Sequence, residues 1–210
     1  MQIDMQENKT LNKILTIAQT EFLEKGFRGA SLREIVKKAG VTTGAFYGYF
    51  KSKEDLFDAL VKEHYEYILG VYDSILCDFK KLSIEDQITH MDDYSSIGFK
   101  KMFEYVWGHK LGFKIILKSS EGTKYENFLD EIALKDINAT NEFCQILEEK
   151  GRSVERIEPL IEQIVISGTF SSFFSLILLD IPKDQAEKGL SQMFQFYRGG
   201  WNCLMHFDNQ

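Results

Sequence analysis

The chain has 210 residues, of which 44% are hydrophobic, and its formal net charge is −7. Its three cysteines, at positions 77, 144 and 203, show no C-x-x-C spacing, and the N-terminal segment MQIDMQENKT is too polar for a secretory signal. These features argue against a disulfide framework and are typical of a protein in a reducing cytosol, so we expect a cytoplasmic location.

The charge is unevenly distributed along the chain. Residues 25–53 contain seven lysines and arginines against one glutamate, whereas residues 64–210 contain 15 basic and 23 acidic side chains. Salt screens surface charges beyond roughly 8–10 Å, so a basic segment attracts a polyanion even when the whole chain is acidic. The N-terminal segment is therefore a candidate nucleic-acid-binding region.

The first predicted elements are helices with recognisable ends. Apolar residues recur every three or four positions between residues 11 and 22, which predicts a helix that ends near Gly26. The stretch SLRE at 31–34 is a capping box that opens a short helix, 32–39, before Gly40. A second capping box, SKED at 52–55, opens a long helix that continues to about residue 80.

The segment between these helices, TTGAFYGYF at 42–50, has a two-faced pattern. On a helix over 43–50, Phe46, Tyr49 and Phe50 share one face, and the two glycines, Gly44 and Gly48, lie opposite. Aromatic anchors and a bare outer surface suit a helix that must approach another molecule closely. Eight helical residues span about 12 Å, similar to the width of the DNA major groove.

The two short helices and their connection form a candidate helix-turn-helix, with the turn at 40–42. Lys53 and the capped helix start at Ser52 offer an ammonium group and free backbone N–H groups, which both suit phosphate oxygens. Glycines that permit helix packing, and lysines that are merely solvated, are the alternative interpretation. The combination of caps, turn, anchors and basic residues favours binding of double-stranded DNA.

The stretch FLEKGFRGASLREIVKKAGVTTGAFYGYFKSKEDLF strongly resembles the N-terminal domain of TetR/AcrR-type transcriptional regulators. The resemblance covers about residues 9–60. It implies a homodimeric, all-helical DNA-binding protein, and most members are repressors that a small ligand releases from DNA. We therefore expect an all-α fold, with a three-helix helix-turn-helix domain over residues 1–53 joined to a larger helical ligand-binding and dimerisation domain over 54–210.

The resemblance also implies roles for single residues. Arg33 matches a position that reaches a base edge, and Thr42, Tyr47 and Lys53 match phosphate-binding positions. Gly48 departs from the pattern, because a longer side chain is frequent there. The complete predicted DNA-binding set, including positions that face bases or lie near the backbone, is Ser31, Arg33, Thr42, Thr43, Gly44, Ala45, Tyr47, Gly48, Tyr49 and Lys53.

The remaining predicted helices cover 83–107, 109–118, 123–150, 154–180 and 183–204. The last two are candidates for the dimer interface, at Gly168, Ser172, Ser175, Phe194 and Trp201. An ordinary intrachain core is the alternative, but the resemblance favours a four-helix dimer interface. Such a dimer would place two recognition helices about one DNA turn apart, ~34–36 Å, on a near-palindromic operator.

The middle of the chain is rich in aromatic residues. A pocket lined by Phe103, Trp107, Phe113, Tyr125 and Phe128 would hold an apolar or aromatic small-molecule effector, although for any single one of these residues core packing is the favoured interpretation. The uncharged run 163–179 is shorter than the ~20 apolar residues of a membrane span and contains four serines, so we expect a buried helix and no membrane association.

The sequence shows no pattern typical of catalysis or metal binding. The four histidines lack ligand spacing, and neither a nucleophile elbow nor a phosphate-binding loop is present. We expect no metal, no cofactor and no enzymatic activity. The leading interpretation is a ligand-responsive repressor. The alternative is a DNA-binding regulator whose C-terminal half responds to a protein partner or only dimerises, and a helical enzyme comes third.

Overall fold

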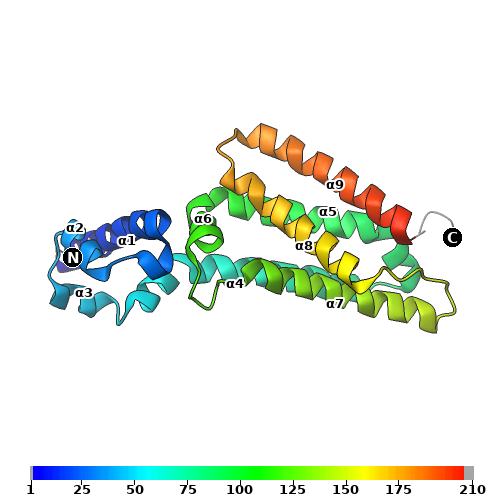
Figure 1. Cartoon of the computed structure of the whole chain (residues 1–210), viewed down its shortest axis with the longest axis horizontal. Helices are drawn as coiled ribbons and strands as arrows, with labels where there is room; N and C mark the ends of the chain where they lie inside the picture. Colours follow the sequence, from blue (N-terminus) through cyan, green and yellow to red (C-terminus); the bar gives the residue numbers. More distant parts are fainter. Residues whose placement is uncertain (1, 206–210) are drawn as a thin grey trace. The chain divides into compact units, whose positions relative to one another are not determined.

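The computed structural model describes residues 2–205, and within that range it contains helices and no strand (Figure 1). The predicted all-α fold is confirmed. The helices are α1 (Gln2–Gly29), α2 (Leu32–Ala39), α3 (Thr43–Tyr49), α4 (Lys53–Lys80), α5 (Ile84–Gly108), α6 (Lys110–Ser119), α7 (Phe128–Glu149), α8 (Pro159–Leu178) and α9 (Lys183–Met205).

The helices pack into two compact units. The first contains residues 1–67 and 109–128, and the second contains residues 68–108 and 129–210. Helix α4 belongs to both units, since the division falls after Tyr67. The predicted boundary after Lys53 instead coincides with the start of α4, and residues 109–128, which we expected in the second domain, pack with the first unit. That residues 1–53 bind DNA, and that residues 54–210 bind the ligand and dimerise, stays a prediction.

Two predicted capping boxes provide helix N-caps. The Ser31 hydroxyl accepts a hydrogen bond from the Glu34 N–H at 3.4 Å, and the Ser52 hydroxyl accepts one from the Asp55 N–H at 3.1 Å. At the other end of α2, Gly40 adopts φ 63°, a left-handed conformation that glycine tolerates best. These local signals place α2 and the start of α4 where the sequence predicts them.

Two other predicted helix starts are wrong by about five residues. The stretch at 123–126 forms turns before α7, because the Thr123 hydroxyl donates to the Ser120 carbonyl at 2.7 Å instead of capping a helix. Helix α8 begins at Pro159 rather than near residue 154, since proline lacks the N–H that the first helical position leaves unused. The Glu158 carboxylate caps this start by accepting from the Leu160 N–H at 2.9 Å.

An aromatic core holds the first unit together. Phe22 and Phe27 of α1 meet Phe57 of α4 with ring centroids 5.0 and 5.3 Å from Phe57. Helix α6 packs along α1, and the turn that follows α6 adds Tyr125, whose ring lies 6.0 Å from Phe57. Tertiary packing of these large rings stabilises α1, α4 and α6 as one body.

The second unit has a separate aromatic core between α5, α8 and α9. Phe99 of α5 contacts Phe170 and Phe173 of α8 at 5.5 and 5.3 Å between ring centroids, and Phe194 of α9 at 4.9 Å. Helices α8 and α9 lie side by side after the short connection 179–182 (Figure 1). The remaining space between the helices of this unit is the cavity described below.

Candidate DNA-binding surface and effector cavity

Helix α3 presents the two faces that its sequence predicts. Phe46 is fully buried and Phe50 is buried, with their ring centroids 5.7 Å apart, whereas Tyr47 keeps 54% of its surface exposed. The exposed face consists of Thr42, Thr43, Gly44, Ala45, Tyr47 and Gly48, and Tyr49 is half-buried. On this surface the residues around Tyr47 carry small side chains or none.

The start of α3 is fixed by Thr42. Its hydroxyl oxygen accepts a hydrogen bond from the Ala45 N–H at 3.1 Å, which makes Thr42 the N-cap. The hydroxyl proton is not used by that bond, so it is available to donate to a phosphate oxygen. Thr42 can therefore cap the helix and contact the DNA backbone at once.

Arg33 and Gly48 occupy open surface. Arg33 is exposed on α2, and its guanidinium forms no hydrogen bond or ion pair among the described residues. A Cβ atom on Gly48 would have no neighbour within 4 Å, so nothing in the chain requires glycine at this position. The space beside Gly48 is thus available to a partner that approaches the helix backbone.

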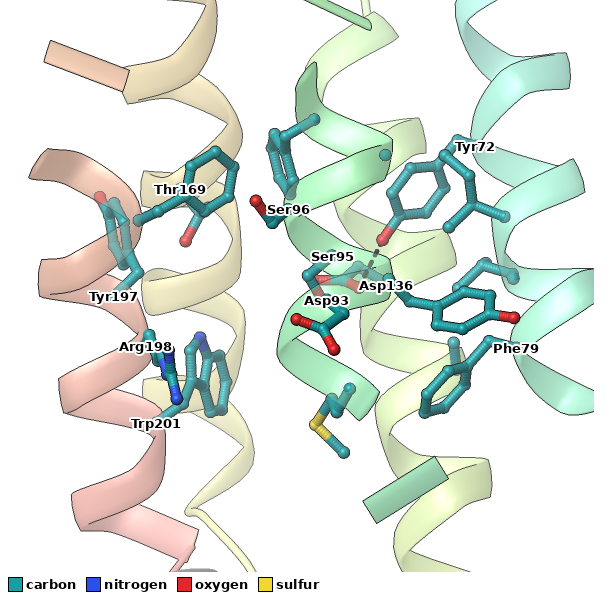
Figure 2. Close-up of a pocket in the computed structure, with 18 of the residues that line it drawn as sticks. Tyr72, Phe79, Asp93, Ser95, Ser96, Asp136, Thr169, Tyr197, Arg198 and Trp201 are labelled. Atoms are coloured by element: carbon teal, nitrogen blue, oxygen red, sulfur yellow. Dashed lines mark hydrogen bonds between the residues drawn. The ribbon is translucent and has the colours of Figure 1, made fainter. Parts of the chain in front are cut away.

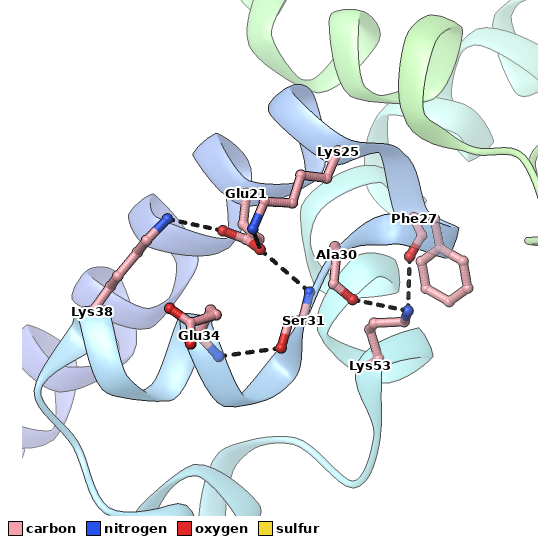
Figure 3. Close-up of polar contacts among 8 residues, drawn as sticks. All are labelled: Glu21, Lys25, Phe27, Ala30, Ser31, Glu34, Lys38 and Lys53. Carbon is pink, nitrogen blue, oxygen red and sulfur yellow. Dashed lines mark hydrogen bonds and ion pairs between the residues drawn. The ribbon is translucent and has the colours of Figure 1, made fainter.

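A buried carboxylate, Glu21, joins α1 to α2 beneath this surface (Figure 3). It is fully buried and accepts from Lys25 at 2.6 Å, from Lys38 at 3.0 Å and from the Ser31 N–H at 3.3 Å. Hydrogen bonds from Lys25 and Lys38, with the Ser31 N–H, outweigh burial and lower the pKa of Glu21 to about 2. The backbone of Ser31 therefore donates to Glu21, whereas a full capping box would pair it with Glu34.

Sequence reasoning missed this network. Glu21 lies next to Phe22 in the apolar stripe of α1 and four residues before Lys25. A charged residue within an apolar stripe, with an opposite charge at i+4, is the signal that would have identified it.

Lys53 has an intramolecular role that the sequence did not indicate. Its ammonium donates to the carbonyls of Phe27 at 2.7 Å and Ala30 at 3.2 Å, and lies 4.5 Å from the centre of the Phe27 ring (Figure 3). It thus joins the end of α1 to the start of α4. An ammonium has three N–H donors, so one remains for the phosphate contact that the resemblance implies.

The second unit contains a partly open cavity of about 1040 Å³ between α4, α5, α7, α8 and α9 (Figure 2). Most of its wall is aromatic or aliphatic. Aromatic residues of all these helices except α8 line it: Tyr72, Phe79, Tyr94, Phe99, Phe103, Phe143, Phe194, Tyr197 and Trp201. The size and the apolar wall are those of a site for an organic small molecule.

The cavity changes the set of candidate effector-binding residues. Of the five predicted residues, Phe103 lines it, and Trp107 stacks on Phe103 at 5.3 Å between ring centroids without lining it. Phe113, Tyr125 and Phe128 are buried in the first unit, in whose core they pack. The structure therefore does not bring the five together around one pocket, because α6 and the turn after it pack against α1 and α4 instead.

One of the acidic groups in the wall of the cavity, Asp136, is bonded to a tyrosine hydroxyl. Asp136 of α7 accepts a hydrogen bond from the hydroxyl of the buried Tyr72 of α4 (Figure 2). Burial raises the pKa of Asp136 to about 6, against the lowering effect of that hydrogen bond, and the nearby Glu162 charge raises it further. A carboxyl with a strongly shifted pKa in a cavity marks a functional candidate.

The predicted dimer-interface residues do not share one surface. Ser172 and Tyr197 form a hydrogen bond at 3.1 Å between α8 and α9, and Gly168 also faces Tyr197. Phe194 and Trp201 line the cavity. Ser175 is the member of the predicted set that is exposed.

Helices α8 and α9, together with the C-cap of α8, instead expose larger apolar side chains: Leu160, Ile161, Ile164, Leu179, Phe196 and Leu204. Among the described residues, α8 is the helix that is long and apolar enough to cross a membrane, with 39% of its most apolar window buried. Length and composition alone do not separate such a helix from one that packs against a partner subunit.

Comparison with known proteins identifies the N-terminal segment. Residues 14–60 match the family model for bacterial regulatory proteins, tetR family, which confirms the predicted resemblance. The chain is 31% identical over 65 residues to the HTH-type transcriptional repressor KstR2 of Mycolicibacterium smegmatis, a match that covers 31% of this chain and 32% of that protein. The chain thus spans about a third of the length of the curated relatives that it matches first.

Solved structures extend the likeness over the whole fold. SCO3833, a TetR-family member from Streptomyces coelicolor A3, aligns over 89% of this chain and 90% of its own, with 16% identity and a TM-score of 0.61. The transcriptional regulator FadR from Bacillus subtilis, solved in complex with stearoyl-CoA, aligns over 88% and 96%, with 18% identity and a TM-score of 0.50. These relatives are transcriptional regulators, not enzymes.

Proposed function

We propose that this chain, which carries a tetR-family helix-turn-helix, is a homodimeric transcriptional repressor that a small molecule releases from a near-palindromic operator. The observation that carries the proposal is the exposed face of α3, whose side chains other than Tyr47 are small and which is held by the buried Phe46 and capped by Thr42. A short helix with this face, next to exposed basic residues, suits the major groove. The reducing cytoplasm is the proposed location.

The contacts divide into two kinds. Thr42, Tyr47 and the third donor of Lys53 are proposed to bind phosphates, which position the protein without reading sequence. Arg33 is proposed to reach a base edge, since its guanidinium is exposed and unpaired within the described chain. Close approach at Gly44 and Gly48 brings the α3 backbone to the bases, where the Ala45 methyl would contact them.

The C-terminal half is proposed to bind the effector in the cavity of about 1040 Å³. A cavity of this size supports a small-molecule effector over the alternative, a regulatory half that answers to a protein partner or only dimerises. Tyr72, Ile75, Leu76 and Phe79 of α4 line it, and the same continuous helix begins at Lys53. A ligand that shifts α4 would therefore act on the element that follows the recognition helix. Such a ligand binds the DNA-free protein more tightly than the DNA-bound protein. The difference between these two ligand-binding free energies equals the free energy of DNA binding that is lost when the ligand is bound.

The dimer is proposed to form through the exposed apolar face of α8 and α9. Phe196 is 76% exposed, so Phe196→Glu places a charge on this face without disturbing the chain's own core. We expect light scattering to give twice the chain mass for the unmodified protein and the single chain mass for this variant. Leu134→Glu, at the 57% exposed Leu134 of α7, is the matched control and should stay dimeric. A monomeric unmodified protein at micromolar concentration would contradict the proposal.

The proposed function is tested by fluorescence anisotropy on DNA flanking the protein's own gene, against scrambled DNA. We expect tight binding to one near-palindrome, and a steep loss of affinity with added salt because phosphate contacts release counterions. Equal, weak binding to both DNAs would contradict operator recognition.

Arg33→Ala should weaken binding to that operator by ~1–3 kcal/mol and relax the preference at one base position. A binding-site selection that gives the same preference for Arg33→Ala as for the unmodified protein would remove Arg33 from base readout.

A further inference from the structure

Asp136 has no lysine or arginine partner among the described residues, unlike Glu104, Glu142 and Glu187 of the same wall. Asp93, the other wall carboxylate without such a partner, is exposed and lies 3.2 Å from His90. Glu142, also in the wall, pairs with Lys80, and Glu104 pairs with Lys183 at 2.7 Å. Asp136 instead accepts a hydrogen bond at one carboxylate oxygen from the neutral Tyr72 hydroxyl. The charge of Asp136 is thus left without a countercharge from the protein.

The surroundings of Asp136 are unfavourable for a lone negative charge. Tyr72 of α4 and Glu162 of α8 act directly on the Asp136 carboxyl, and the Glu162 charge adds repulsion. The other charged residues of the cavity wall are Lys80 of α4, Asp93, Lys100 and Glu104 of α5, Glu142 of α7, and Glu187 and Arg198 of α9. No basic side chain of this wall forms an ion pair with Asp136 among the described residues. Asp136 is only partly exposed. A carboxylate withdrawn from water without a countercharge costs free energy, and a ligand that supplies the missing positive charge removes that cost.

The rest of the wall also suits a cation with an apolar body. Phe99, Phe103, Phe194 and Trp201 line the cavity, and the faces of aromatic rings attract positive charge. The apolar surface of these rings would cover the uncharged part of the same ligand. An anion of the same shape would meet the Asp136 charge and the negative faces of the rings, so both features select against it.

We propose that the cavity of the second unit takes an organic cation with an aromatic or apolar body, and that Asp136 supplies its countercharge. This inference rests on the proposed function, since it names the chemical class of the effector for the same cavity. It separates this chain from its structural neighbour that was solved with stearoyl-CoA, an anionic ligand.

The inference is tested with two ions of nearly the same size and shape but opposite charge, tetraphenylphosphonium and tetraphenylborate. Isothermal titration without DNA measures the affinity of the full chain for each. We expect the cation to bind at least ~10-fold more tightly than the anion, and Asp136→Asn to weaken cation binding by ~10-fold while it strengthens anion binding. Asparagine keeps an acceptor for Tyr72, so the variant removes the charge and little else.

The pH dependence gives a second readout. Protonation of Asp136 below its pKa of about 6 removes the countercharge, so the unmodified protein should lose cation affinity between about pH 7.5 and about pH 5. Asp136→Asn should show no such loss over this range. Asp130→Asn is the matched control: Asp130 lies on the same helix, α7, is exposed and does not line the cavity, so its loss should leave cation affinity nearly unchanged.

Three results would overturn the inference: no binding of tetraphenylphosphonium by the unmodified protein, equal binding of both ions, or unchanged cation binding in Asp136→Asn. Operator binding, measured on the same preparation, separates this failure from that of the proposed function. A protein that binds its operator but not the cation leaves the repressor proposal standing and removes the cationic effector. A protein that binds the cation through Asp136 but binds no operator leaves the cation site standing and removes the repressor proposal.

Discussion

Glu21→Gln should destabilise the first unit by about 3 kcal/mol at neutral pH, although the change adds no bulk and lies outside the recognition helix. The carboxylate is fully buried and receives two lysine ammonium groups and the Ser31 N–H. Its pKa falls from the usual 4.5 to about 2, and each unit of that difference is worth about 1.4 kcal/mol of stability. A glutamine keeps the shape but leaves Lys25 and Lys38 without their countercharge.

The stability that Glu21 contributes depends on pH. Because the folded-state pKa of Glu21 lies below the unfolded value, its contribution is complete above about pH 4.5 and disappears as the pH falls towards about 2. The stability difference between the unmodified chain and Glu21→Gln should therefore shrink as the pH is lowered below about 4.5. Chemical denaturation followed by circular dichroism, at a series of pH values, measures this difference.

Glu24→Gln is the matched control for this prediction. Glu24 lies on the same helix, is exposed, and forms no ion pair among the described residues. Its substitution should change stability by less than about 0.5 kcal/mol. If Glu24→Gln and Glu21→Gln proved equally mild at pH 7, the buried network would not stabilise the domain.

The sequence predicted the recognition helix well because its determinants are local. The spacing of Phe46, Phe50, Gly44 and Gly48 sets their faces on any helix, and Ser31 and Ser52 cap the neighbouring helices by bonds within three residues. Local hydrogen bonds and helical periodicity need no knowledge of tertiary structure. Helical periodicity also predicted the all-helical fold.

The cavity was not predictable in the same way. Phe103 and Phe113 have the same side chain ten residues apart, yet Phe103 lines the cavity of the second unit and Phe113 is buried in the first. Which core an aromatic residue joins depends on where α6 turns back onto α1, and that is a matter of long-range packing. Asp136 escaped notice because a single aspartate on a helix is ordinarily a solvated residue.

The sequence also could not show whether α8 and α9 pack against each other within the chain or against a partner subunit. Gly168 and Ser172 were predicted to let a partner approach, and they face Tyr197 of the same chain. A stripe of small residues predicts close helix packing, but it does not say which helix comes close. The large exposed residues, such as Phe196, mark the outer face more clearly than the small ones do.

Phe46→Ala should abolish operator binding by unfolding the helix-turn-helix, at a cost of ~3–5 kcal/mol in stability. Phe46 is fully buried, and its ring lies against Phe50 at 5.7 Å and Tyr47 at 5.4 Å. Removal of this ring leaves α3 without its main anchor, and a seven-residue helix is unstable alone. Hydrogen exchange should show lost protection of the α3 amides, and anisotropy should show no specific DNA binding.

Tyr47→Phe, one residue along the same helix, should lower DNA affinity without lowering the stability of the helix-turn-helix. It keeps the ring that contacts Phe46 and removes only the exposed hydroxyl, so stability and α3 protection should stay unchanged. If that hydroxyl donates to a phosphate, operator affinity should fall about tenfold, and affinity for scrambled DNA should fall by a similar factor, because a phosphate contact carries no sequence information. A loss confined to the operator would instead place Tyr47 against a base. Unchanged affinity for both DNAs would take the exposed hydroxyl out of the interface, and the bare face around Gly44 and Gly48 would then be the part of α3 that meets DNA.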